Sequence, residues 1–184
     1  MERHHGGNSS LWRGITAGAI GGAIGSSAMV LFNHLLGASG FAREDLGERE
    51  QHRRIAAKPN DADGTISDEP ATEKAASNIY ETATGEPLDA SGQRRAGSLL
   101  HHLFGAAAGA VYGAAASKVP QLAAGGGLPY GAFVWFAAAE TGLPLAGLAN
   151  PPSSYRWQRH AASLATHLAF GATLEAVRRS MTRR

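Results

Sequence analysis

The stretch from residue 14 to residue 42 constrains this chain most, because its 29 consecutive residues include no Asp, Glu, Lys or Arg. Trp12 and Arg13 precede the stretch, and Arg43 follows it. A helix rises ~1.5 Å per residue, so about 20 apolar residues cross the hydrocarbon core of a bilayer. The stretch therefore predicts a membrane-spanning helix.

Small residues recur at every fourth position of this predicted helix. Gly14, Gly18 and Gly22 form one row, and Ser26 continues it. Small residues at this spacing let a second helix approach closely, which is how membrane helices gain packing where no hydrophobic effect drives them together. We expect these glycines to form a helix–helix contact.

Three further runs resemble the first. Residues 96–117 and 119–139 also lack acids and bases, and residues 160–174 form a weaker, Ala-rich run with arginines on both sides. Gly105, Gly109 and Gly113 repeat the spacing of four in the second run. A soluble bundle needs a polar face on every helix, and the first three runs have none. The sequence thus predicts an all-α integral membrane bundle of four Gly/Ala-rich transmembrane helices, at about 12–37, 97–118, 121–141 and 157–179.

Charge is concentrated between the first and second runs. Residues 43–95 hold 12 of the 15 acids and 8 of the 17 bases, a net charge of −4. The remaining bases lie at the ends of apolar runs, and no basic patch with interleaved aromatics exists, so nucleic acid is not an expected partner. The chain has no cysteine, which excludes disulfides and thiolate metal sites.

These features divide the chain into three parts. Residues 1–42 hold a polar tail and the first helix, residues 43–95 a long hydrophilic acidic loop, and residues 96–184 the other three helices and a basic C-terminus. Within the loop, residues 70–84 carry a thin apolar stripe that fits either a short surface helix or a disordered segment. A cleaved signal peptide is disfavoured, because its apolar core is usually only ~7–15 residues long.

The segment after the third run is rich in proline and aromatic residues. Pro144, Pro151 and Pro152 each remove a backbone donor, so residues 143–152 are expected to form a loop or a short re-entrant segment. The residues that follow combine aromatic rings with arginines, as interfacial anchors do: Tyr155, Arg156, Trp157 and Arg159.

The predicted location is a membrane that the chain crosses several times. An even number of spans places both termini on the same side of the membrane. The basic residues near the chain ends indicate that this side is the cytoplasm. The lipid bilayer is the expected partner, and other membrane proteins or a second copy of the chain are further candidates.

Three elements in order carry a family resemblance. They are His101 with Tyr112 and Pro120, then Pro144-Leu145-Ala146-Gly147-Leu148 followed by Pro151-Pro152, and then His167 with Glu175. With the first run, this pattern resembles the YagU-like family of uncharacterised bacterial inner-membrane proteins. The resemblance implies a multi-span protein of the bacterial inner membrane, and it implies no reaction, cofactor or catalytic residue.

The ionisable residues inside the predicted spans are the candidate functional residues, because such residues are costly in a membrane. His101, His167 and Glu175 are candidates for a proton-responsive or polar interior line. A second group of four is expected near one membrane face: His34, His102, Glu140 and His160. Structural hydrogen bonds, headgroup solvation and an ion pair of Glu175 with the arginines that follow it are the alternatives.

Three function classes fit these patterns. The first is a structural or accessory membrane protein that acts through close helix packing. The second is a pH-responsive protein or minor transporter that uses intramembrane His and Glu. The third is a metal-dependent membrane enzyme, which is the weakest because spacing encodes no metal site. The sequence also has no Walker-type phosphate loop, no G-x-S-x-G and no H-E-x-x-H motif. Catalysis is thus not the favoured function, and we predict no catalytic residue, metal or cofactor.

Overall fold

The computed structural model describes residues 5–38 and 70–183, and these residues form helices and turns without a strand. The all-α prediction is confirmed for them. Most of the predicted acidic loop, residues 43–69, lies outside the described residues.

Two long helices correspond to the first and second apolar runs. α1 spans His5–Ala38 and α4 spans Ala90–Lys118. Both contain a stretch long and apolar enough to cross a membrane, Ser10–Gly37 in α1 and all of α4. α4 begins earlier than the predicted residue 97, because the Asp89 side chain accepts a hydrogen bond from Gly92 N at 2.8 Å and caps it.

The two glycine rows face each other where α1 and α4 cross. A Cβ added to Gly109 would lie 2.9 Å from Gly22 Cα and 3.0 Å from the Gly18 carbonyl carbon. Gly113 meets Gly14 in the same way, and Gly105 meets Gly22 and Ser26. The helices therefore approach with backbone against backbone, a distance that only glycine allows.

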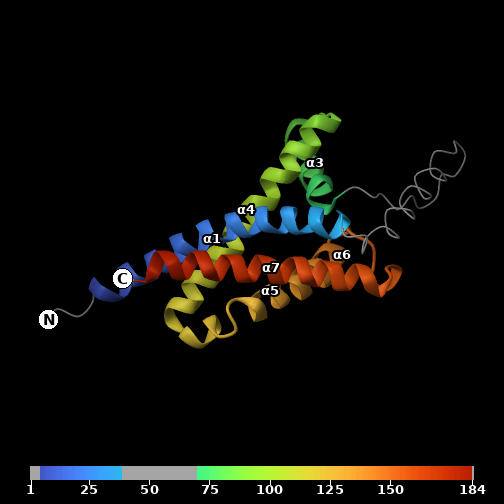
Figure 1. Cartoon of the computed structure of the whole chain (residues 1–184). Helices are drawn as coiled ribbons and strands as arrows, with labels where there is room; N and C mark the ends of the chain where they lie inside the picture. The colour runs from blue at the N-terminus through green and yellow to red at the C-terminus, as the bar shows by residue number, and fades with distance from the viewer. Residues whose placement is uncertain (1–4, 39–69, 184) are drawn as a thin grey trace, which may run out of the picture.

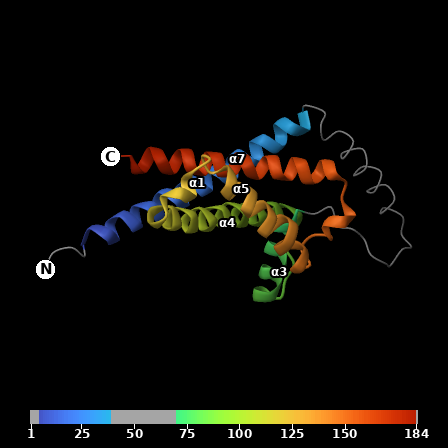
Figure 2. The same ribbon diagram turned by 90° about the horizontal axis from the view of Figure 1, so that it is seen from below.

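α7, Trp157–Thr182, packs on another face of α1. Here Gly21 faces the Leu174 backbone and Gly25 faces the Phe170 ring. The buried core lies between α1, α4 and α7 and consists of Met29, Tyr112, Ala116, Phe170 and Leu174. Figures 1 and 2 show that the start of α1 and the end of α7 lie at the same end of the bundle.

The third apolar run is not the continuous helix expected over about 121–141. A short 3-10 turn, η1 (Pro120–Ala123), leads into Gly125, Gly126 and Gly127, whose φ angles are +77°, +65° and +86°. Glycine adopts this left-handed backbone at little cost, so the chain turns here before the helix begins. α5 (Leu128–Val134) then continues as a π-helical segment, η2 (Trp135–Gly142), and as α6 (Leu143–Leu145).

α5 packs against α7 through a further glycine contact, in which Gly127 and Gly131 meet Gly171. After α6 the chain turns at Gly147 and forms a short 3-10 helix, η3 (Pro152–Ser154), before α7.

α3, Ala71–Thr84, lies against the first half of α4 (Figure 1). Ala76 is its buried residue, and the backbone of Glu73 leaves no room for a side chain at Gly97 of α4. α3 thus lies at the end of the bundle that also holds α6 and the start of α7 (Figure 1).

Candidate functional site

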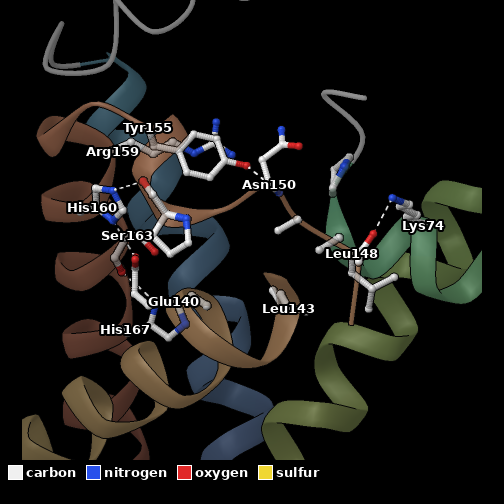
Figure 3. Close-up of a pocket in the computed structure, with 16 residues that line it drawn as sticks. Lys74, Glu140, Leu143, Leu148, Asn150, Tyr155, Arg159, His160, Ser163 and His167 are labelled. Atoms are coloured by element: carbon white, nitrogen blue, oxygen red, sulfur yellow. Dashed lines mark hydrogen bonds and ion pairs between the residues drawn. The ribbon is translucent and has the colours of Figure 1, made fainter. Parts of the chain in front are cut away.

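Two adjoining cavities lie at that end of the bundle. The first, the polar cavity, has a volume of about 410 Å³ and lies between α3, η2, the segment after α6, and the start of α7 (Figure 3). The second, the apolar cavity, has a volume of about 320 Å³ and extends between α1, α3, α4 and α7. Each volume falls within the ~300–1,000 Å³ typical of small-molecule sites.

Glu140 and His160 form the polar centre of the first cavity. His160 Nδ1 lies 2.8 Å from Glu140 Oε1, and His160 Nε2 lies 3.1 Å from the Pro152 carbonyl oxygen. The Pro152 carbonyl oxygen only accepts hydrogen bonds, so His160 donates to it from Nε2, and Nδ1 shares a hydrogen bond with the Glu140 carboxyl group. The pair joins η2 to α7, and its side chains are 15% and 27% exposed.

Two basic residues border the cavity from opposite sides. Lys74, from α3, donates from Nζ to the Gly147 carbonyl oxygen at 2.7 Å (Figure 3). The Arg159 guanidinium lies over the Tyr155 ring, 4.0 Å from its centroid. Tyr155 in turn accepts a hydrogen bond from Asn150 N at 3.2 Å, which fixes the chain between α6 and α7.

His167 stands where the two cavities meet. Its Nδ1 lies 2.8 Å from the Ser163 carbonyl oxygen, so Nδ1 carries the proton and Nε2 is an acceptor in the neutral ring. The cavities share five lining residues: Ala71, Ala139, Leu143, Leu148 and His167. His167 is the one residue among them with a titratable side chain.

The apolar cavity has few polar groups. Met29, Phe104, Val134 and Phe170 contribute much of its wall, and His101 lies on its α4 side. The structure thus brings His101 and His167, which are 66 positions apart in sequence, onto one cavity. Whether either histidine is functional stays a prediction.

The four residues expected near one membrane face do not form one cluster. Glu140 and His160 pair, but His102 bonds to Ser27 and to the Ser98 carbonyl oxygen, at 3.1 and 2.8 Å. His34 is exposed on α1. Across residues 5–38 and 70–183, no group of three or more His, Asp or Glu side chains is placed to hold a metal ion.

Glu175 lies away from both cavities, toward the C-terminal end of α7. Its carboxylate is 1% exposed and accepts hydrogen bonds from Arg178 at 2.6 and 2.9 Å and from Arg179 Nε. Arg179 also donates to the Ala123 carbonyl oxygen at 2.6 Å, which fixes the turn before α5 to α7. Phe170 and Leu174 fill the core between His167 and this network, so Glu175 has the contacts of a structural ion pair.

Lys74 and Arg159 were not candidate site residues in the sequence. Arg159 belongs to the predicted interfacial anchor, but Lys74 is one of many charges in the acidic segment, and no pattern there distinguishes it. Its position becomes apparent only because α3 packs on α4.

These observations define a protein that is all-helical over its described residues, where two helices are long and apolar enough to cross a membrane. In the comparison to protein families, residues 83–176 match the family described as a protein of unknown function, DUF1440. The match covers more than half of the chain, and the chain belongs to this family. The family is uncharacterised, as the resemblance implied, although the match does not name the YagU-like proteins. Among curated proteins and among solved structures, none matches the chain.

Proposed function

We propose that this chain is a multi-pass protein of the bacterial inner membrane with a structural or accessory role. Four segments lie in the bilayer: α1, α4, the helical stretch 128–145, and α7. Both termini are cytoplasmic. The protein acts through close helix packing, with itself or with other membrane proteins, rather than through catalysis.

The observation that carries this proposal is the apolar outer surface. The most apolar windows of α1 and α4 are only 33% and 28% buried within the protein. Leu31, Val111 and Phe133 are each more than 60% exposed, on three different elements. The core helix of a soluble protein buries its apolar side chains, whereas lipid is the solvent that accepts them on the outside.

The two remaining segments support the same arrangement. α7 has 26 residues, a length of about 39 Å, with Trp157 at its start and Arg179 in its last turn. Such aromatic and basic residues are typical of the two membrane interfaces. The stretch 128–145 is interrupted by π-helical geometry, but it packs on α7, and irregular backbone is tolerated in a membrane where protein covers it.

The proposal is tested by extracting membranes from expressing cells at high pH in carbonate. The protein should stay in the membrane pellet, because its apolar surface has no favourable place in water. Recovery of folded protein in the supernatant would contradict a spanning arrangement.

A second candidate function is a pH-responsive membrane protein or minor transporter. It is favoured by the apolar cavity that His101 and His167 both line, since histidine changes charge between about pH 5 and 8. A proton flux into liposomes that His167→Gln abolishes would support it. An unchanged flux in His101→Gln and His167→Gln would remove it.

A further inference from the structure

We propose that the polar and apolar cavities form one binding site for an anionic amphipath with a single hydrocarbon chain. The carboxylate or phosphate head lies in the polar cavity between Lys74 and Arg159. The hydrocarbon chain lies in the apolar cavity between α1, α4 and α7.

The charges of the polar cavity favour an anionic head. Its lining includes two basic side chains, Lys74 and Arg159, and one acid, Glu140. Glu140 is already paired with His160. Among the described residues no carboxylate pairs with Lys74 or with Arg159, so both cations have hydrogen-bond donors left for a ligand.

The two cations are mounted on different elements. Lys74 projects from α3, where one of its three N–H donors is used on Gly147, and Arg159 projects from the first turns of α7, where the Tyr155 ring supports it. An anion between them would link α3 to the bundle through charge-assisted hydrogen bonds, which are about twice as strong as neutral ones.

The apolar cavity favours a chain rather than a second polar group. Leu100, Phe104 and Val134 line it, and Phe104 is 58% exposed on the outer face of α4. The cavity is therefore bordered by a residue that also faces the surroundings of the helices. A chain can enter from that side while its head stays at the polar cavity.

His167 sits between head and chain. Its Nε2, which accepts in the neutral ring, has no hydrogen-bond partner among the described residues. The other four shared lining residues, Ala71, Ala139, Leu143 and Leu148, are small or apolar.

The test uses the full-length protein in lipid nanodiscs and a dodecanoate probe with a photoreactive diazirine near its methyl end. We expect crosslinks on α4 around Leu100 and Phe104 and on α7 around Phe170. Excess unlabelled dodecanoate or dodecyl phosphate should compete, whereas neutral dodecanol should not. Competition by only one of the two anions would identify the head as carboxylate or as phosphate, and either result supports the site.

Two substitutions at half-buried polar positions provide the matched variants. Lys74→Gln and Arg159→Gln should each weaken competition by about tenfold, because each removes one charge-assisted contact. Lys118→Gln removes an equal charge at an exposed position outside both cavities and should change nothing. Ala75→Phe, which fills the apolar cavity from α3, should abolish the crosslinks.

Three results would overturn the proposal. They are crosslinks spread evenly over the outer surface, equal competition by dodecanol, or unchanged competition in the Lys74→Gln/Arg159→Gln variant with its helix content intact.

Discussion

Substitution of Gly109 by alanine tests the closest contact between α1 and α4. The added Cβ would lie 2.9 Å from Gly22 Cα and 3.0 Å from the Gly18 carbonyl carbon, and closer still to the Gly18 oxygen. Real Cβ atoms almost never approach another heavy atom within 3.0 Å, so the Gly18 oxygen sets the displacement, and the helices must separate by roughly 1 Å. The rows continue at Gly105 and Gly113, so this separation loosens the neighbouring contacts as well.

The expected magnitude combines two opposing effects. Overpacking of a close contact costs about 1–3 kcal/mol, and the higher helix propensity of alanine offsets about 1 kcal/mol of this. Gly109→Ala should therefore lower the free energy of unfolding by up to about 2 kcal/mol. Gly109→Leu adds three more heavy atoms with no further propensity gain, so its cost should be clearly larger.

The assay is equilibrium unfolding of the purified protein in mixed detergent, followed by helix content. Gly37→Ala is the matched control, because a Cβ at Gly37 of α1 meets nothing within 4 Å; it should be neutral or slightly stabilising. If Gly109→Leu and Gly37→Leu unfold at the same detergent composition, the fold does not depend on the glycine contact.

Three further predictions concern single polar groups. Glu175→Gln should destabilise the protein by about 1–3 kcal/mol in the same assay. Loss of a fully buried ion pair would cost more, but the arginine partners of Glu175 are partly exposed. An unchanged stability would show that these ion pairs contribute nothing. Tyr130→Phe removes a hydrogen bond of 2.7 Å to the Ala108 carbonyl oxygen and should cost about 0.5–1.5 kcal/mol, whereas no loss would mean that water replaces the hydroxyl. The hydrogen bond from Gly92 N at the start of α4 lowers the pKa of Asp89 below its ordinary value. The stabilisation by this cap is therefore fully present above the pKa that Asp89 has in the unfolded chain, and it is lost as the pH falls through the pKa of Asp89 in the folded protein. Amide hydrogen exchange in the first turn of α4 should therefore accelerate in acid beyond the intrinsic change, and Asp89→Asn should remove this effect; identical acid profiles would contradict it.

The sequence was most informative where one chemical property repeats along the chain. Runs without charge locate α1, α4 and α7 to within several residues, and the spacing of four predicts which face of α1 is small. The same property misled at the third run, because absence of charge cannot distinguish a straight helix from one that turns. There the backbone of Gly125, Gly126 and Gly127 decides the path.

The candidate site was less predictable because it depends on contacts between distant elements. Topology predicted that Glu140 and His160 lie near the same membrane face, but not that they pair at 2.8 Å. It could not separate them from His34 and His102, which face other directions. The position of Lys74 at the polar cavity follows from the packing of α3 on α4, and no local sequence pattern predicts that packing.

Single-cysteine labelling tests the spanning arrangement most directly, because the chain has no native cysteine. Val111→Cys on α4 and Phe133→Cys on α5 replace side chains that are 66% and 63% exposed in the protein itself. In intact membranes, both positions should resist a water-soluble maleimide and react only after detergent is added. Ser180→Cys should react from the cytoplasmic side and Thr84→Cys from the opposite side. Rapid labelling of Val111→Cys and Phe133→Cys without detergent, or of Ser180→Cys and Thr84→Cys from the same side, would contradict the account.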